Sequence, residues 1–173
     1  DVNDYMAKAV KDGAQLVVFP EGMGFASLPL VPMYSSIRSR LKGAAQEDKL
    51  EAMEEISDAL IDYFYEVYST LFSELARAHR VYLAAGSIYV FEDDSLRSRA
   101  FLYDPSGKEI SWQDKLFPSG EELDMGMQGG ESVNVAKTPL GGIAMLIGQD
   151  DEYYEPFKIA SLTGADLVAF SSA

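Results

Sequence analysis

The sequence predicts an α/β fold built in layers around a mixed sheet, and three observations support that prediction. Short apolar runs rich in β-branched residues alternate with helical patterns in the first half of the chain. Strand-like runs then cluster in the middle, and alternation with a helix returns toward the C-terminus. This order of elements is typical of a sheet that combines parallel and antiparallel strands and is covered by helices.

The first half of the chain is predicted to contain two long helices and one strand. Apolar residues recur at helical spacing over residues 2–12, and Gly13 follows in the position of a C-terminal glycine. Residues 16–19 form a continuous apolar run of the kind found in a strand covered on both faces. A long loop with a short helix is expected over residues 22–47. The clearest helix runs from about residue 48 to residue 79, because apolar residues recur there every three or four positions.

The second half of the chain is predicted to consist mainly of strands. A turn is expected at residues 104–107, where proline and glycine occupy their usual turn positions. A helix is expected over residues 156–162, with Gly164 ending it. The predicted strands, read from apolar runs between turn signals, cover residues 81–90, 100–103, 132–136, 143–147 and 166–170.

Composition and charge exclude several classes of function. A length of 173 residues with 47% hydrophobic content predicts a single domain. The formal charge of −14 disfavours binding to nucleic acid or to anionic membrane surfaces. No apolar run approaches the ~20 residues of a membrane-spanning helix, and the first residues lack the pattern of a signal peptide, so a cytoplasmic location is expected. The absence of cysteine excludes disulfides, cysteine-ligated metals and thiol catalysis by this chain.

Three positions are candidates for chemistry. Glu21 comes directly after the strand at residues 16–19, at the edge where open α/β sheets bind ligands. Lys115 offers a positive charge that can stabilise an oxyanion. Gly148 follows the strand at residues 143–147 and begins an acidic turn. Each position has an ordinary structural explanation when it is taken alone.

Taken together, these segments resemble the nitrilase, or carbon-nitrogen hydrolase, superfamily. The segments are Phe19-Pro20-Glu21, Gln113-Asp114-Lys115 and Ile147-Gly148-Gln149-Asp150. In that family a Glu, a Lys and a Cys hydrolyse amides or nitriles, and the resemblance therefore implies that Glu21 is the general base and that Lys115 stabilises the oxyanion. A different register would put Gln113 at the lysine position. Glu122 or Glu121 corresponds to a further orienting glutamate, while Glu121, Gln149 and Asp150 are expected in the substrate pocket.

The family resemblance also implies a fold, the nitrilase-like α-β-β-α sandwich. Residues 1–173 are expected to form a single incomplete domain that covers roughly the N-terminal two-thirds of the family domain. A partial sheet would expose apolar edges, so a longer protein or a partner is expected to complete it.

The residue at the nucleophile position leaves three functional hypotheses open. Gly148 stands where the family has cysteine, and glycine has no side chain that can attack a carbonyl or nitrile carbon. The favoured interpretation is an inactive homologue that binds a small amide, nitrile or carboxylate, or that has a regulatory role. The alternatives are an active amidase-type hydrolase whose cysteine has been replaced by engineering or a sequence error, and a structural protomer of a homo-oligomer. No cofactor and no metal site are expected.

Overall fold

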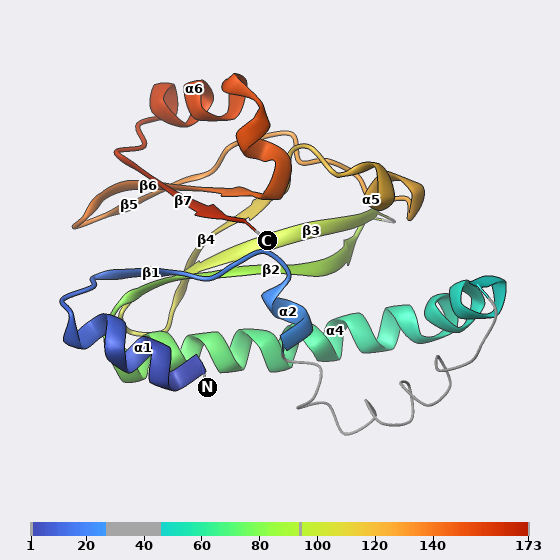
Figure 1. Ribbon diagram of the computed structural model, residues 1–173, viewed down its shortest axis with the longest axis horizontal. Coiled ribbons are helices and arrows are strands. Elements are labelled where there is room, and N and C mark those ends of the chain that lie inside the picture. Colours follow the sequence, from blue (N-terminus) through green and yellow to red (C-terminus); the bar gives the residue numbers. More distant parts are fainter. Residues whose placement is uncertain (1, 27–45, 94, 173) are drawn as a thin grey trace.

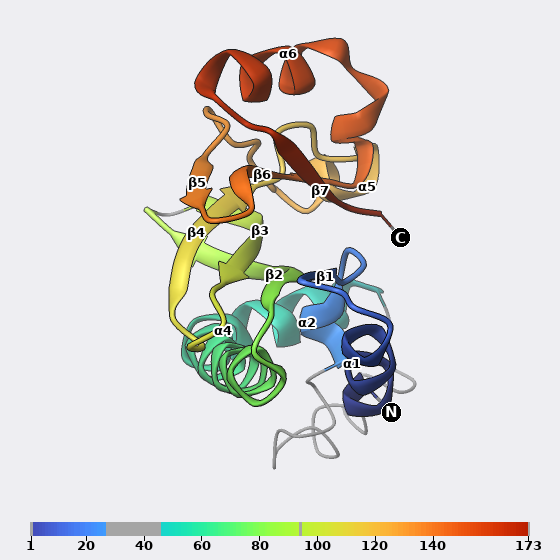
Figure 2. The same ribbon diagram turned by 90° about the vertical axis from the view of Figure 1, so that its left-hand side faces the viewer.

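The computed structural model describes residues 2–26, 46–93 and 95–172, which form two β-sheets packed face to face between layers of helices (Figure 1). The first sheet has the strand order β1-β2-β3-β4, and the second has the order β5-β6-β7. Figure 2 shows the four layers in sequence, with α1 and α4 outside the first sheet and α6 outside the second. The predicted α-β-β-α arrangement is confirmed.

The first sheet combines one parallel pair with an antiparallel meander. Its strands are β1 Leu16–Val18, β2 Tyr82–Glu92, β3 Ser95–Tyr103 and β4 Glu109–Asp114. β1 runs parallel to β2, whereas β2, β3 and β4 pair antiparallel. The helices on its outer side are α1 Val2–Lys11 and α4 Gln46–His79, with the single turn α2 Met23–Ala26 beside them.

The second sheet contains the crossover that forms one wall of the candidate site. β5 Val135–Thr138 pairs antiparallel with β6 Gly141–Ile147, which pairs parallel with β7 Leu167–Ser171. The connection from β6 to β7 passes through the 3-10 turn η2 Gly148–Glu152 and the helix α6 Tyr154–Thr163. Gly164 ends α6 with a φ of 98°, as the sequence predicts for a C-terminal glycine.

Alternation along the strands of the first sheet divides its side chains between two cores. Leu83, Phe101 and Tyr103 pack toward the helices, in the cluster that contains Tyr68 of α4. Leu102 lies in the other cluster, between the sheets, among residues of both sheets. Because successive side chains of a strand point to opposite faces, the same two strands hold both layers together. The residues of the inter-sheet cluster are Ala84, Ala100, Leu102, Ala136, Ile143, Met145, Ile147 and Ala169.

A close backbone approach at Gly86 positions the segment that follows β1. Gly86 has a φ of 77°, and a Cβ atom there would lie 2.1 Å from the carbonyl oxygen of Pro20. The hydroxyl of Tyr68 donates to the carbonyl of Gly86 over 3.0 Å, and the N–H of Gly22 donates to the hydroxyl of Ser87 over 3.0 Å. The residue after Pro20 is therefore held against the middle of β2.

The structure departs from the sequence prediction at several elements. β4 was not predicted, because the alternation of Ile110 and Trp112 is short and lies among polar residues. The helix α5 Gly120–Asp124 and the turn η2 were missed as well, and each has only five residues. β5 begins at residue 135 rather than 132, and β2 continues to residue 92. Of the long loop predicted for residues 22–47, residues 27–45 lie outside the described residues.

Within the described segments, no helix is both long enough and apolar enough to cross a membrane. The long helix α4 carries acidic residues throughout its sequence, and its described apolar side chains pack on the first sheet.

Truncating Leu102 is expected to destabilise the interior between the two sheets. Leu102 is fully buried there, so Leu102→Ala should lower the free energy of unfolding by about 2–5 kcal/mol through lost contacts and a cavity. Chemical denaturation measures the change. Leu162→Ala is the matched control, because Leu162 is 79% exposed on α6 and its truncation should change stability by no more than about 0.5 kcal/mol. Equal losses in both variants would contradict the assigned core.

Candidate active site

Three charged side chains from different elements meet beside the inter-sheet core. Lys115 directly follows β4, and its Nζ atom lies 2.8 Å from Oε1 of Glu21 and 2.7 Å from Oε2 of Glu122. Glu21 follows β1, and Glu122 lies in α5. The side chain of Lys115 is only 3% exposed, so both contacts are shielded from solvent on the lysine side. The structure thus brings together residues that are 94 positions apart in the sequence.

The backbone of Lys115 is fixed on both sides of the chain. Its N–H donates to the carbonyl of Ser98 on β3 over 2.8 Å, and its own carbonyl accepts from the N–H of Gly130 over 2.9 Å. The preceding residue, Asp114, accepts two hydrogen bonds from the Arg99 guanidinium, at 2.6 and 3.1 Å. These contacts fix the backbone from which the Lys115 side chain extends into the site.

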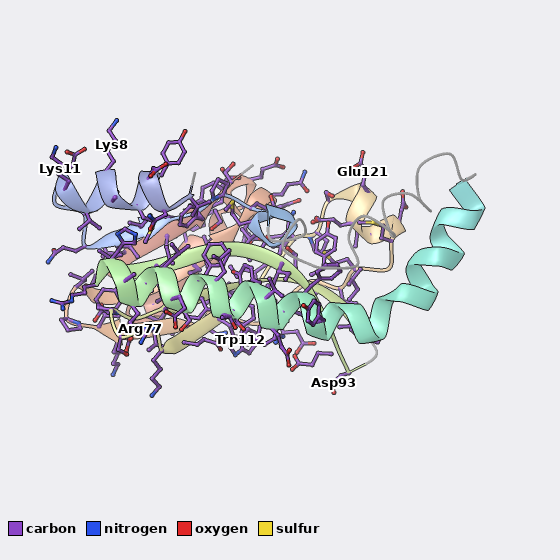
Figure 3. The ribbon with its side chains drawn as sticks, turned by 90° about the horizontal axis from the view of Figure 1, so that it is seen from below. Lys8, Lys11, Arg77, Asp93, Trp112 and Glu121 are labelled. Atoms are coloured by element: carbon purple, nitrogen blue, oxygen red, sulfur yellow. The ribbon has the colours of Figure 1, made fainter. Side chains whose placement is uncertain are left out.

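A helix cap determines which glutamate of α5 contacts Lys115. Ser119 caps α5, its hydroxyl accepting from the N–H of Glu122 over 3.3 Å. Oε2 of Glu122 accepts in return from the N–H of Ser119 over 2.7 Å, so this oxygen binds the cap and Lys115 together. Glu121 is exposed and projects from α5 toward solvent (Figure 3). Of the two glutamates left open by the sequence, Glu122 is the one in contact with Lys115.

Burial and charge pairing shift the pKa values of Lys115 and Glu122 in opposite directions. Burial alone lowers the pKa of Lys115, but its hydrogen bonds to Glu122 and Glu21 outweigh that effect, and the pKa is raised. Burial alone raises the pKa of Glu122, but the hydrogen bonds from Lys115 and from the Ser119 N–H lower it overall. Both groups are therefore charged at neutral pH.

Gln113, the alternative candidate for the lysine position, lies away from this cluster. Its side chain is fully buried and holds β4 against the segment before β5. Nε2 donates to the carbonyl of Ser132 over 2.7 Å, and Oε1 accepts from the N–H of Asn134 over 2.8 Å. Gln113 therefore has a packing role in this structure, and Lys115 is the residue that faces Glu21.

Asp150, expected from the sequence in the substrate pocket and as a hydrogen-bond acceptor in the turn after β6, accepts three backbone hydrogen bonds in this structure. Its carboxylate is fully buried and does not line the cavity. Oδ1 accepts from the N–H groups of Leu116 and Phe117, each over 2.9 Å, and Oδ2 accepts from the N–H of Ile147 over 3.0 Å. Burial raises the pKa of Asp150, while these N–H donors lower it in part. Asp150 thus joins the turn after β6 to the chain after Lys115.

Gly148 begins that turn with a φ of 52°, in the left-handed region that side-chain-bearing residues rarely adopt. A Cβ atom at this position would lie 2.5 Å from Oε2 and 2.8 Å from Oε1 of Glu21. The carboxylate of Glu21 therefore fills the space into which a side chain at position 148 would project. The glycine offers no side chain for attack at this position, and the space is taken by the Glu21 carboxylate.

These groups open onto a cavity of about 500 Å³. Six residues named by the sequence line it, namely Glu21, Lys115, Glu121, Glu122, Gly148 and Gln149. The sequence did not assign the other lining residues to the site, although Asp151 and Glu152 lie in the segment that contains Gly148. These other lining residues are Gly22, Ser87, Tyr89, Ser119, Met125, Asp151, Glu152 and Ser172. Within the described residues, no group of three or more His, Asp or Glu side chains is arranged to hold a metal ion.

Comparisons with known proteins agree with this fold. A family model described as carbon-nitrogen hydrolase matches residues 1–173. The probable hydrolase YhcX of Bacillus subtilis is 33% identical over 109 residues, which are 62% of this chain and 21% of that protein. Two solved structures of an amidase from Nesterenkonia each match 99% of this chain with a TM-score of 0.68. One is the amidase itself, at 23% identity, with 56% of its chain covered.

The second structure is a mutant of the same amidase with a cysteine replaced by alanine, in complex with butyramide. It is 22% identical, and 57% of its chain is covered. The present chain thus spans little more than half the length of these amidases and about a fifth of the Bacillus protein. At this level of identity the structural matches establish the fold.

Replacing Glu122 with glutamine is expected to change the pH dependence of stability. The pKa of Glu122 is lowered on folding, so its carboxylate contributes stability above its unfolded pKa of about 4.3, and this contribution is lost as the pH falls through the folded pKa. Thermal unfolding should show the wild type more stable than Glu122→Gln by about 1–3 kcal/mol at pH 7, with the gap closing under acid conditions. The exposed neighbour variant Glu121→Gln should show no such pH-dependent gap. A gap that stays constant into strong acid would contradict the assignment.

A side chain at position 148 is expected to disturb Glu21 as well as the backbone. Gly126→Ala provides the control, because Gly126 also has a left-handed φ, of 81°, but has no atom within 4 Å of an added Cβ. The control should cost about 1–2 kcal/mol from backbone strain alone. Gly148→Ala should cost more, because the Glu21 carboxylate must also move. Denaturation curves compare the two variants, and equal costs would show that Glu21 does not occupy this space.

Proposed function

Since this chain belongs to the carbon-nitrogen hydrolase family, we propose that it binds a small amide, nitrile or carboxylate beside Lys115 and turns it over little or not at all. The observation behind the proposal is the combination of an intact charged cluster with a glycine at the nucleophile position. Lys115, Glu21 and Glu122 are in contact at the wall of a cavity of about 500 Å³. Gly148 stands at the same wall.

The covalent route of the family requires a thiol, and this chain contains no cysteine. Covalent catalysis divides a difficult hydrolysis into two easier steps, and without a nucleophile the first step has no starting group. Glu21 could still activate a water molecule as a general base. Direct attack by water lacks the advantage of the covalent intermediate, and we expect slow turnover or none.

Lys115 and Glu21 together provide a donor and an acceptor for an amide. The ammonium group has three N–H donors, of which Glu21 and Glu122 accept two, so one remains for a ligand oxygen or a nitrile nitrogen. Each Glu21 oxygen has two acceptor sites and can accept a further hydrogen bond, such as one from an amide N–H. The Nesterenkonia mutant in which alanine replaces a cysteine was solved in complex with butyramide, which supports amide binding without a thiol in this fold.

Two alternatives also have an observation in their favour. An amidase-type hydrolase whose cysteine has been replaced is favoured by the presence of Glu21, Lys115 and Glu122 in mutual contact. A structural protomer of a homo-oligomer is favoured by apolar side chains exposed on α6 and β7. These include Tyr154, Ile159, Leu162, Leu167 and Val168.

Calorimetric titration with butyramide, butyronitrile and butyrate tests the proposal with three ligands of matched chain length. Butyramide should bind, and Lys115→Met should weaken it about tenfold or more, because a charged hydrogen bond to the carbonyl oxygen is lost. Lys137→Met is the control, since Lys137 is exposed and outside the cavity. Binding by none of the three ligands, or no effect of Lys115→Met, would contradict the proposal.

Ammonia release from butyramide separates the alternatives. The wild type should release little or none. If Gly148→Cys gives hydrolysis that thiol reagents block, the replaced-cysteine alternative gains support. If no ligand binds and sedimentation shows a stable oligomer of the wild type, the structural alternative is favoured instead.

A further inference from the structure

The charge of the cavity wall is strongly unbalanced. Among the described residues that line the cavity there are five carboxylates and one cation, Lys115, so this part of the wall has a formal excess of four negative charges. The five are Glu21, Glu121, Glu122, Asp151 and Glu152. A cavity with walls of one sign concentrates ions of the opposite sign.

These carboxylates fall into an inner pair and an outer group. Glu21 and Glu122 form the inner pair, and Lys115 is bound to both. The outer group, called here the acidic rim, consists of Glu121, Asp151 and Glu152, which are exposed. Among the described ion pairs, none involves a rim residue. Their negative charge is therefore available to a ligand.

Lys115 gives the cavity a second, separate requirement. Its side chain is only 3% exposed. After its hydrogen bonds to Glu21 and Glu122, one of the three N–H donors of the ammonium group is left for a ligand. A ligand that satisfies the inner end must therefore bring a hydrogen-bond acceptor, such as an amide oxygen. The same ligand meets excess negative charge at its outer end.

A solvated acidic surface is the simpler explanation of the rim, because Glu121 lies in the first turn of α5, where negative charge is favoured. The same preference applies to Asp151 and Glu152, which lie just before the helix α6. Helix position does not explain why carboxylates from two elements line one cavity. Asp151 and Glu152 come from η2, a different element, and line the same cavity. Tyr89 also lines it, and tyrosine rings attract cations through their faces.

We propose that the ligand of this cavity is an amide that carries a positive charge, an amine or a guanidinium group, a few bonds from the amide carbon. The amide end binds at Lys115 and Glu21, and the cationic end faces the acidic rim. This inference rests on the proposed function and specifies its ligand class. The same charges disfavour an amide that carries a negative charge. They also disfavour the carboxylate ligands that the proposed function includes.

Three amides with the same four-carbon skeleton test the charge preference. They are 4-aminobutanamide, which is cationic, butyramide, which is neutral, and succinamate, which is anionic. Calorimetry at low ionic strength should give about tenfold tighter binding of 4-aminobutanamide than of butyramide, with succinamate weakest. The preference should shrink when the ionic strength is raised to about 0.5 M, since rim charges are exposed and screened.

A pair of double variants assigns the preference to the rim. Glu121→Gln/Glu152→Gln removes two rim charges and should lower the affinity ratio of 4-aminobutanamide to butyramide about threefold or more. Asp12→Asn/Glu131→Gln removes the same number of charges from exposed positions outside the cavity and should leave the ratio unchanged.

The outcomes separate this inference from the proposed function. If butyramide binds and 4-aminobutanamide binds no better, the charge preference is overturned while amide binding stands. If both double variants lower the ratio equally, the preference reflects the net charge of the protein and the rim assignment is overturned. If none of the three amides binds, the proposed function fails, and the inference fails with it.

Discussion

The candidate site depends on one interaction, the contact of the Lys115 ammonium with Glu21 and Glu122. Lys115 belongs to the chain after β4, Glu21 to the chain after β1, and Glu122 to α5, so a single cation joins three segments that the backbone does not join directly. Removing one partner from a buried charged cluster leaves the others unpaired. The resulting loss of stability is larger than the net stabilisation that the pair contributes. The three residues therefore constrain one another, and replacing one of them alters the pairing of the other two.

Asp150 has the corresponding role for the backbone around the site. Its carboxylate accepts N–H groups from both sides, from Ile147 at the end of β6 and from Leu116 and Phe117 after Lys115. The turn that contains Gly148 is thereby fixed relative to the lysine segment. The shape of this turn is thus maintained by the carboxylate of Asp150 and needs no side chain at position 148.

Sequence patterns predicted the layers and the charged cluster better than the details between them. The strands β2 and β6 could be recognised because their apolar runs reflect burial on both faces, and β1 because its apolar run is continuous, although Val18 is 38% exposed. Glu21 follows such a run, whereas Lys115 follows β4, which the pattern did not predict, so the role of Lys115 beside Glu21 was implied by the family resemblance. The lining residues Tyr89 and Ser172 could not be predicted, because their place depends on strand register and on the Gly86 approach, which are tertiary properties. The backbone partners of Asp150 depend on tertiary packing as well, since burial decides whether an acidic residue faces a cavity or the backbone.

The charge balance of the cluster bears on the proposed binding of an amide. Lys115 is neutralised by two carboxylates, so the three groups together carry one net negative charge at neutral pH. Stabilising an oxyanion needs positive charge or donors that become more effective as negative charge develops on the substrate. In this cluster the second carboxylate weakens that gain, while a neutral amide can still use the free N–H of Lys115 and the oxygens of Glu21. Interactions that are as strong in the ground state as in the transition state give affinity without rate. Gly148 has no side chain that could form a covalent bond, so the remaining charged groups are the ones on which the proposed binding of an amide depends.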